Sequence, residues 1–199
     1  MSKHRVKEDA MRVIAGNFKG RQLKAVSGNA TRPTTDKVKE SIFQMLGPFF
    51  DGGYCLDLFA GSGGLGIEAL SRGMERTIFI DKQLKAIQTI KENLHTLSIQ
   101  NQAEVYRNDA YRAINVLSKR NICFQLILLD PPYGKLDYEK MIHHILNKNL
   151  LAPDGLLYCE HDIHEQLPEL EPKLVKIKQD HYGGTIGITI YKKGVLINE

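Results

Sequence analysis

The sequence lacks an apolar run that approaches the roughly 20 residues needed to cross a membrane, so we expect no membrane partner. Residues 1–10 are polar and lack the apolar region of a signal peptide, which favours a cytoplasmic protein. Cysteine is scarce: the three are Cys55, Cys123 and Cys159, and no two have the spacing of metal ligands. Each lies within an apolar, strand-like run, so we expect reduced core residues and no bound metal.

Internal repeats and low-complexity tracts are also missing from the sequence. Its 199 residues fit one α/β domain with an appendage better than two full domains. The 42% of hydrophobic residues suffice for a buried core, and the 25% of charged residues favour solubility. We expect a polar extension over residues 1–10, an appendage over 11–50 and the main domain over 51–199.

Acidic residues are rare at the start of the chain. Residues 1–39, here called the basic arm, contain ten Lys or Arg against three acidic residues, whereas the other 160 residues contain 17 against 20. A basic arm on a mildly acidic body indicates a polyanionic partner that binds the N-terminal region. A solvated charged surface is the alternative interpretation. The candidate contacts to the polyanion are Arg12, Lys19, Arg21 and Lys24.

The basic arm and the residues after it predict a hairpin and a helix. Residues 11–26 combine strand-like segments with glycines that suit a turn. Thr34 or Thr35 can cap a helix that runs to about Leu46, because apolar residues recur there near helical spacing. Gly and Pro at 47–48 then end the helix. The two strand candidates of the hairpin are 11–14 and 21–26.

From residue 54 onward, strand-like and helix-like patterns alternate along the chain. The apolar runs cover 54–60, 76–80, 103–107, 124–129 and 155–159. The amphipathic stretches cover 64–73, 82–97, 109–119 and 137–148. This alternation predicts a parallel sheet with helices on both faces. Two further strands are expected at 173–178 and 185–192, and because no helix fits between them, the last strand should run antiparallel.

A glycine-rich loop, residues 61–66, follows the first apolar run and fits G-x-G-x-x-G, with Asp81 placed 20 residues after Gly61. Alone, this pattern is a dinucleotide fingerprint, in which glycines allow close approach and the acid binds a ribose. Asp57 argues against NAD, because a carboxylate at the strand's end would repel a pyrophosphate. It suits the α-ammonium of S-adenosylmethionine, whose carboxylate can bind loop N–H groups and whose ribose can bind Asp81. A glycine turn without a ligand is the competing interpretation.

The segment 130–133, Asp-Pro-Pro-Tyr, follows the fourth apolar run, at the switch point where sheets of this type bind ligands. Prolines lack N–H groups, so their carbonyls are rigid acceptors without competing donors. The Asp130 carboxylate and the Pro131 carbonyl can accept both hydrogens of a planar amine such as guanine N2 or adenine N6, which raises the electron density on its nitrogen. Tyr133 offers a face on which the base can stack. The alternative is a Pro-rich turn with Asp130 as a helix cap.

Together these motifs resemble those of amino-group methyltransferases that act on nucleic acids. More narrowly, the segments 11–16, 19–21, 32–40 and 57–72 resemble the RsmD-type 16S rRNA (guanine-N2)-methyltransferases. The resemblance implies a Rossmann-like class I methyltransferase fold of the α/β class, with a mostly parallel seven-stranded sheet, an antiparallel last strand, and an N-terminal β-hairpin and helix. It also implies that the N-terminal appendage helps to bind 16S rRNA within an assembling small ribosomal subunit.

The same resemblance implies that Asp81 binds the cofactor ribose and that Asp109 contacts the adenine amine. Arg32 and Thr34 are candidates for the methionine end of the cofactor, and helix capping is the competing role for Thr34. The candidate catalytic residues are Asp130, Pro131, Pro132 and Tyr133. The candidate S-adenosylmethionine-binding residues are Asp57, Phe59, Ala60, Gly61, Ser62, Gly63, Gly66, Asp81, Lys82, Asp109, Ala110, Arg32 and Thr34.

Three other features have competing interpretations. Glu68 can aid cofactor binding or be an exposed acid near a helix N-terminus. Residues 159–164 contain metal-binding residue types but lack a second ligand pair, which disfavours a metal site. His143 and His144 are expected as a pair on a helix surface.

The leading hypothesis is transfer of a methyl group from S-adenosylmethionine to the N2 amine of a guanine in 16S rRNA. The nearest alternative is adenine-N6 methylation of DNA or RNA, because the same four residues, 130–133, suit both amines. The chain is too short for a large target-recognition domain, which disfavours a sequence-specific DNA enzyme. An NAD-binding oxidoreductase is a further alternative, tested by thermal stabilisation with each cofactor. A non-catalytic RNA-binding module is another, but it gives no reason for Asp-Pro-Pro-Tyr beside a cofactor loop.

Overall fold

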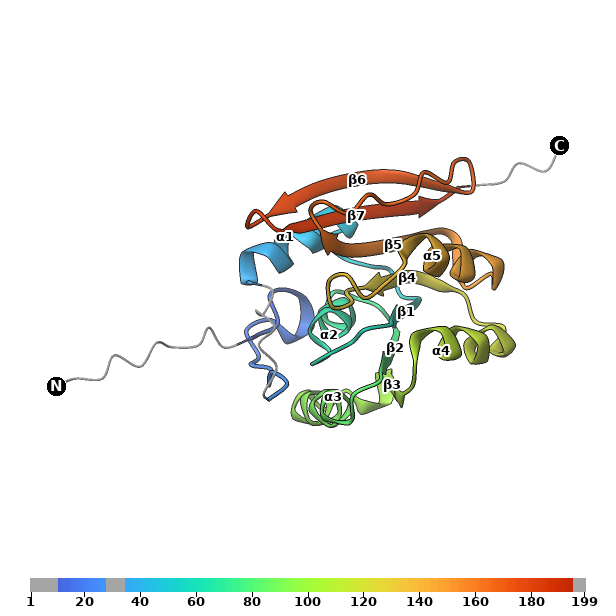
Figure 1. The fold of residues 1–199 in the computed structure, drawn as a ribbon. Helices are drawn as coiled ribbons and strands as arrows, with labels where there is room; N and C mark the ends of the chain where they lie inside the picture. The colour runs from blue at the N-terminus through green and yellow to red at the C-terminus, as the bar shows by residue number, and fades with distance from the viewer. Residues whose placement is uncertain (1–10, 28–34, 195–199) are drawn as a thin grey trace.

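The computed structural model describes residues 11–27 and 35–194, arranged around one seven-stranded sheet (Figure 1). The sheet order is β3-β2-β1-β4-β5-β7-β6. The first five strands in this order are parallel, whereas β7 pairs antiparallel with both β5 and β6. The predicted sheet, with its antiparallel last strand, is confirmed. Residues 1–10, Arg32 and Thr34 lie outside the described residues, so the polar extension and the cofactor contacts of Arg32 and Thr34 stay predictions.

The bounds of the elements match the predicted alternation closely. The strands are β1 Tyr54–Asp57, β2 Arg76–Asp81, β3 Ala103–Arg107, β4 Phe124–Leu129, β5 Leu151–Asp162, β6 Leu174–Tyr182 and β7 Ile186–Lys193. The α-helices are α1 Asp36–Leu46, α2 Gly64–Ser71, α3 Leu84–Leu97, α4 Ala110–Leu117 and α5 Tyr138–Asn147. Short 3-10 helices are η1 Gly16–Phe18, η2 Gln100–Gln102 and η3 Ser118–Arg120.

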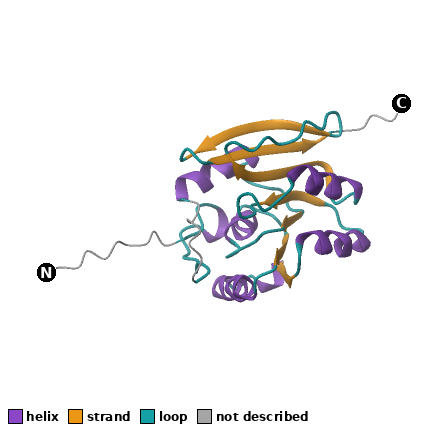
Figure 2. Cartoon of the chain, viewed as in Figure 1, coloured by secondary structure: helices purple, strands orange, loops and turns teal. Residues whose placement is uncertain are grey.

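Helices cover both faces of the sheet and produce two hydrophobic cores (Figure 2). The strand β4 shows the reason, because Ile127 and Leu129 enter the core under α4 and α5, while Leu126 and Leu128 enter the core under α1, α2 and α3. Successive side chains of a strand point to opposite faces, so an apolar run without alternation needs cover on both.

The predicted hairpin over 11–26 is present in a reduced form. One antiparallel bridge joins Arg12 and Gln22, and the turn between them contains η1. Neither of the two predicted strands forms as such. The physical reason is that the backbone N–H groups of Ile14 and Ala15 donate to the carboxylate of Glu68 on α2, and not to a facing strand.

The helix predicted after the hairpin is confirmed as α1. Its N-cap is Thr35, whose Oγ1 accepts a hydrogen bond from the backbone N–H of Val38 at 3.4 Å. The helix ends at Leu46, where Gly47 follows with φ of 117°. A left-handed backbone of this kind costs glycine little, so the predicted stop at Gly47 has a conformational cause.

The prediction that all three cysteines lie in the core is wrong for one of them. Cys55 and Cys159 are buried, but Cys123 is exposed, and all three are free thiols. Cys123 immediately precedes β4, and the alternation of the strand turns Phe124 inward in its place. No helix among the described residues has the length and apolar character to cross a membrane.

Candidate active site

The predicted motifs meet at the carboxyl ends of the two central strands. β1 pairs in parallel with β2 on one side and with β4 on the other, with Asp57 opposite Leu128. The glycine loop leaves the end of β1, and Asp130 directly follows the end of β4. The crevice between two such strands is where open α/β sheets bind ligands. The fold therefore brings the two sequence motifs together, as predicted.

The glycine loop is held in shape by Asp81 at the end of β2. Its Oδ2 accepts a hydrogen bond from the Gly61 N–H at 2.9 Å, and its Oδ1 accepts one from the Gln83 N–H at 2.7 Å. Gly61 and Gly63 have φ of 53° and 83°, a region that suits glycine. Asp81 thus holds the glycine loop in its conformation. Its predicted contact with the cofactor ribose stays a prediction.

The third glycine of the pattern serves packing. A Cβ on Gly66 would lie 2.3 Å from Cε1 of Phe79 on β2, so α2 can approach the sheet this closely only without a side chain there. Gly66 also donates its N–H to Oδ2 of Asp57 at 3.2 Å. One residue therefore fixes both the distance from helix to strand and the carboxylate at the end of β1.

Asp57 is a buried acid, with 2% of its surface exposed. Burial, opposed by the hydrogen bond from the Gly66 N–H and reinforced by the nearby Asp81 carboxylate, raises the pKa of Asp57 to about 7. A carboxylate removed from water in this way is stabilised by a cation, because opposite charge replaces the lost hydration. This environment suits the ammonium partner that the sequence predicts.

Asp130 is the acid of the second motif, and no described residue donates a hydrogen bond to its carboxyl group. Burial raises the pKa of Asp130 well above its usual value, and the charges of Glu160 and Asp57 raise it further. The neighbouring Pro131 is buried, and its carbonyl accepts no hydrogen bond from the described residues, whereas the Pro132 carbonyl accepts one from Lys135 at 3.2 Å. Two acceptors, the Asp130 carboxyl and the Pro131 carbonyl, therefore remain available to a ligand.

Glu160 on β5 is a site residue that the sequence interpretation missed. It is 5% exposed, and its Oε1 accepts a hydrogen bond from the Tyr133 hydroxyl at 3.1 Å. Its Oε2 accepts one from the Tyr158 hydroxyl at 2.9 Å. The sequence segment 159–164 suggests only a disfavoured metal site, and no metal-binding cluster of three residues occurs within 11–27 and 35–194. The sequence signal that could have identified Glu160 as a site residue is its position as an acid directly after the apolar run 155–159.

The residues predicted for the adenosine end lie one strand farther along the sheet. Asp109 follows β3 and is the N-cap of α4, where its Oδ1 accepts from the N–H groups of Tyr111 and Arg112 at 3.0 and 3.2 Å. Asn108 donates its N–H to the Asp81 carbonyl at 3.0 Å, which places Asp109 beside Asp81. The remaining predicted residues are the exposed Lys82, the half-buried Phe59 and Ser62, and the buried Ala60 and Ala110.

The interpretation of Glu68 as an exposed acid is wrong, whereas a part in cofactor binding stays a prediction. Glu68 is fully buried on α2, and its oxygens accept from Ile14 N at 2.8 Å, from Ala15 N at 2.9 Å and from Arg72 Nε at 2.9 Å. Lys39 on α1 lies 3.5 Å away as a further cation. Glu68 therefore joins the N-terminal segment and α1 to α2, and its oxygens have protein partners.

A second tether joins the N-terminal segment to the glycine loop. Asn93 on α3 donates from Nδ2 to the carbonyls of Lys24 at 3.0 Å and Ser62 at 2.9 Å, and its Oδ1 accepts from the Lys24 N–H at 2.8 Å. The Ser62 hydroxyl also contacts the sulfur of Met11 at 3.4 Å. The segment 11–27 is consequently joined to the glycine loop both through Asn93 and through Met11.

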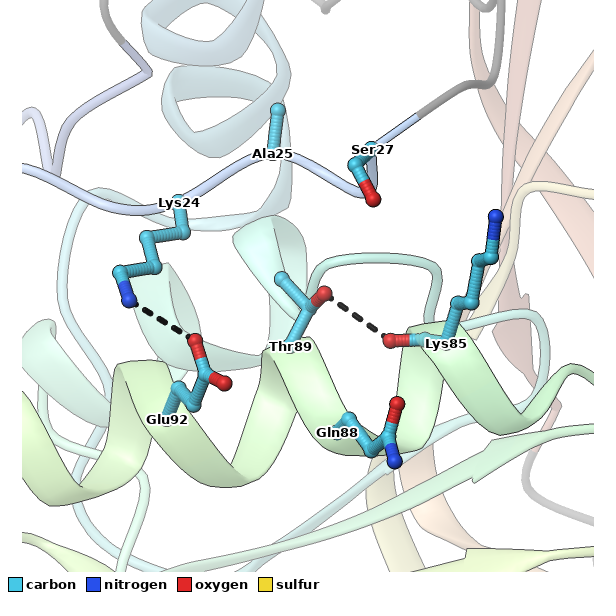
Figure 3. A pocket seen from close by; sticks show the side chains of 7 residues that line it. All are labelled: Lys24, Ala25, Ser27, Lys85, Gln88, Thr89 and Glu92. Carbon is cyan, nitrogen blue, oxygen red and sulfur yellow. Dashed lines mark hydrogen bonds and ion pairs between the residues drawn. The ribbon is translucent and has the colours of Figure 1, made fainter.

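The four predicted RNA contacts lie on the surface, and three of them already have protein partners. Arg12 pairs with Asp36 at 2.7 Å, and Arg21 donates to the Thr96 carbonyl at 2.8 Å. Lys24 pairs with Glu92 at 2.9 Å, at the edge of a hollow of about 220 Å³ on α3 (Figure 3). Exposed pairs of this kind contribute at most about 1 kcal/mol, so a phosphate can replace the acid. Lys19 is exposed.

The two histidines predicted on the surface of α5 differ. His143 is exposed, as predicted, whereas His144 is half-buried against the ring of Tyr111, with ring centroids 5.6 Å apart. The prediction is wrong for His144, because α4 packs beside α5 and covers that face of the helix.

Comparisons with known proteins agree with this geometry. The family model described as conserved hypothetical protein 95 matches residues 11–192. The protein YlbH of Bacillus subtilis (strain 168) is 56% identical over 183 residues, which cover 92% of this chain and 99% of YlbH. Ribosomal RNA small subunit methyltransferase D of Escherichia coli (strain K12) is 31% identical over 183 residues, 92% of this chain and 90% of that protein.

A solved structure also shares the fold along almost the whole chain. The structure of yhhF from Escherichia coli superposes with a TM-score of 0.79 and 31% sequence identity, and covers 93% of this chain and 98% of that one. The family model and the relatives, together with the shared fold, identify the same group. The chain belongs to the family described as conserved hypothetical protein 95, and it is an RsmD-type methyltransferase.

Proposed function

We propose that this protein transfers the methyl group of S-adenosylmethionine to the exocyclic N2 amine of a guanine in 16S rRNA. The observation that carries the proposal is the pair of free acceptors at the end of β4, the Asp130 carboxyl and the Pro131 carbonyl, next to the loop that follows β1. Two acceptors at a rigid turn match the two hydrogens of a planar amine. The similarity to ribosomal RNA small subunit methyltransferase D supports an rRNA base as the source of that amine.

The residues around β1 and β2 fit S-adenosylmethionine. When bound, this cofactor supplies a methyl group activated by a positively charged sulfur. Asp57 offers a buried carboxylate to its ammonium, and the N–H groups of the glycine loop can bind its carboxylate. Asp81 has lone pairs left for ribose hydroxyls, and Asp109 stands beside it for the adenine amine. Burial without a matched cation is costly for Asp57, so the acid itself supports a cationic ligand.

The residues after β4 orient the amine. Asp130 and Pro131 hold its two hydrogens, which keeps the nitrogen lone pair directed away from them and raises its electron density. Tyr133, half-exposed at the mouth of the site, stacks on the ring of the base. Since the methyl group is already activated, orientation and local electrostatics suffice, and the protein needs no covalent intermediate. The deprotonated form of Asp130 then accepts the proton that the methylated amine releases.

The N-terminal region supports rRNA as a partner. Arg12, Lys19, Arg21 and Lys24 lie on the surface of an appendage over 11–50, and this appendage is bonded to α2 and α3 through Glu68 and Asn93. In this proposal the appendage is a rigid extension that binds RNA phosphates next to the site. The substrate is 16S rRNA in an assembling small subunit, which fits a cytoplasmic enzyme.

The test combines a deletion with a transfer assay. Cells that lack the protein should lose one N2-methylguanosine from 16S rRNA, measured by mass spectrometry of nucleosides, and purified protein with S-adenosylmethionine should restore it on small-subunit particles from those cells. Protein carrying Asp130→Ala serves as the matched control and should restore nothing. Restoration of N6-methyladenosine instead would transfer the proposal to the adenine amine. No methylation of any RNA would favour a non-catalytic RNA-binding module.

A further inference from the structure

Tyr133 occupies a loop that by itself leaves the ring poorly restrained. The loop between β4 and α5 contains a turn closed by the Lys135 N–H on the Pro132 carbonyl, with Gly134 at φ of 66° inside it. The Tyr133 side chain is 43% exposed, so packing covers only part of it. An aromatic ring in such a position can rotate about two side-chain bonds, and its use as a stacking surface then costs conformational entropy.

One hydrogen bond restrains the outer end of this ring. The Tyr133 hydroxyl donates to Oε1 of Glu160 at 3.1 Å, across 27 positions of sequence. Because the hydroxyl lies at the tip of the ring, a bond there fixes the direction of the ring axis. The ring's attachment at the backbone and this bond at its tip together fix the ring axis, and with it the place of the ring in the site.

Glu160 is itself held firmly from three directions. Its second oxygen accepts from the Tyr158 hydroxyl at 2.9 Å, and its backbone carbonyl accepts from the Tyr138 hydroxyl on α5. The backbone of β5 is paired on both sides, with Cys159 opposite Leu129 of β4 and Glu160 opposite Ile188 of β7. A carboxylate with one hydroxyl on each oxygen and a fixed backbone is a rigid anchor for the partner of either oxygen.

The choice of a carboxylate at this position is costly for folding alone. Burial raises the pKa of Glu160, and its charge in turn raises the pKa of the neighbouring Asp130. A neutral or apolar side chain would avoid two adjacent buried acids. Each tyrosine hydroxyl, however, donates to a separate oxygen of Glu160, and a carboxylate provides both acceptors without a competing donor.

We propose that Glu160 is a positioning residue for methyl transfer, which anchors the Tyr133 hydroxyl so that the ring is fixed as a platform for the target base. This role rests on the proposed function, because it assumes that Tyr133 stacks on the base. Glu160 does not touch the reacting atoms, and its effect on the placement of the base over the acceptors at 130–131 passes through Tyr133. The effect of its charge on the pKa of Asp130 is separate.

The test is a double-mutant cycle on methyl transfer to small-subunit particles, with kcat and KM measured for RNA and for S-adenosylmethionine. Glu160→Ala and Tyr133→Phe should each lower kcat/KM for RNA by roughly 10-fold, the loss expected for a hydrogen bond to a charged acceptor. The double variant should also lose only roughly 10-fold, because both changes break the same bond. KM for S-adenosylmethionine should change by less than about 2-fold in all three variants.

Two further variants separate positioning from a merely structural role. Glu160→Gln keeps an acceptor oxygen for Tyr133, whereas Glu160→Ala removes it. At alkaline pH, where Asp130 is ionised in every variant, Glu160→Gln should therefore retain kcat/KM within about 3-fold of the wild type, and Glu160→Ala should not. Tyr182→Phe is the matched control, since it removes an exposed hydroxyl that donates to Asp180 at 2.7 Å on β6, and it should leave the kinetics unchanged. Melting temperatures of all variants identify any loss that is due to unfolding.

The outcomes distinguish this inference from the proposed function. If wild-type protein methylates no RNA, the proposed function fails. If the wild type is active but the losses from Glu160→Ala and Tyr133→Phe multiply to roughly 100-fold, Glu160 acts independently of Tyr133 and the positioning role is overturned. Equal losses from Glu160→Gln and Glu160→Ala would overturn it too, since charge rather than the hydrogen bond would then matter.

Discussion

The Asp57 carboxylate accepts a hydrogen bond from the Gly66 N–H at 3.2 Å, and this contact joins the end of β1 to the first turn of α2. The bond only partly offsets the burial of the acid, whose pKa is raised to about 7. An acid with a raised pKa in the folded state binds a proton more tightly when folded. Its contribution to stability is therefore complete below about pH 4 and is lost as the pH rises through about 7.

Asp57→Asn should consequently stabilise the ligand-free protein at about pH 8 and have little effect on stability at about pH 4, because Asn resembles the protonated acid. The gain in free energy of unfolding is at most about 4 kcal/mol, from roughly three pKa units at 1.36 kcal/mol each. The same variant should bind S-adenosylmethionine at least about 10-fold more weakly, because the ammonium loses its charged partner. Thermal melts at both pH values and calorimetry with S-adenosylmethionine and with NAD measure these effects. A wild-type protein that binds NAD and ignores S-adenosylmethionine would refute the cofactor assignment.

Asp130→Ala should abolish methyl transfer and leave the affinity for S-adenosylmethionine within about 2-fold. The carboxylate is proposed to hold the target amine, away from most of the cofactor. Single-turnover kinetics and cofactor calorimetry separate the two quantities. Retention of more than about a tenth of wild-type kcat, a barrier change below about 1.4 kcal/mol, would contradict this role for Asp130.

Because the pKa of Asp130 is raised, wild-type kcat should increase with pH. Glu160→Gln should move this increase to lower pH, because it removes a negative charge near Asp130.

Neutralising the basic arm should reduce the salt dependence of RNA binding. Glutamine at Arg12, Lys19, Arg21 and Lys24 should raise KM for RNA and flatten the plot of log affinity against log salt by about one unit for each phosphate that the arm no longer binds. Cofactor affinity should stay unchanged. The matched control replaces four exposed lysines on other surfaces, Lys119, Lys148, Lys173 and Lys178. If both sets flatten the slope equally, the arm is a solvated surface with no special part in RNA binding.

Tyr133→Ala should lower kcat/KM for RNA by roughly 100-fold, whereas Tyr133→Phe should lose only roughly 10-fold because the ring face remains. The base must leave its stack to reach Asp130, and a ring in the site compensates part of the unstacking free energy, about 1–3 kcal/mol. Steady-state kinetics with melting temperatures measured in parallel separate this role from packing. Equal damage from the two substitutions would show that the hydroxyl outweighs the ring, against the stacking role.

Glu68→Ala should destabilise the protein by about 3–5 kcal/mol, because Lys39 would lose its ion-pair partner in a buried site and Arg72 would keep only Glu40. The amide protons of Ile14 and Ala15, which donate to Glu68, should then exchange with solvent faster than in the wild type. Denaturant unfolding and hydrogen exchange measure the two effects. Glu139→Ala, an exposed acid in the first turn of α5, is the matched control and should stay within about 0.5 kcal/mol of the wild type. Unchanged exchange at residues 14 and 15 would refute the anchoring role.

The sequence was most informative where local pattern and tertiary environment agree. Apolar runs covered on both faces are visible without a structure, and so are the motifs at the ends of β1 and β4, because parallel strands with helical crossovers must end at the same edge. Asp57, Asp81 and Asp130 were therefore found as a group. The raised pKa values of Asp57 and Asp130 depend on burial, which the sequence pattern indicates only indirectly.

Three of the misses share a physical cause, which is long-range contact by a polar side chain. Glu68 has the sequence position of an exposed acid, yet the segment at 14–15 docks on it across more than 50 positions. In the sequence Glu160 looks like an ordinary polar residue at the end of a strand, and only the fold shows that Tyr133, from another loop, donates a hydrogen bond to it. The hairpin strands were overpredicted for the same reason, since the N–H groups at 14 and 15 found a carboxylate partner. The local periodicity of a sequence carries no information on hydrogen bonds between segments that lie far apart along the chain.

Asn93 gives the enzyme a property that neither ligand site has alone. Its amide bonds Lys24 of the basic arm and Ser62 of the glycine loop at the same time, so it joins the two backbones. In the proposed function RNA binds the arm and S-adenosylmethionine binds the loop, and any coupling between two binding sites is reciprocal. Whatever factor RNA applies to the affinity for S-adenosylmethionine, S-adenosylmethionine applies to the affinity for RNA.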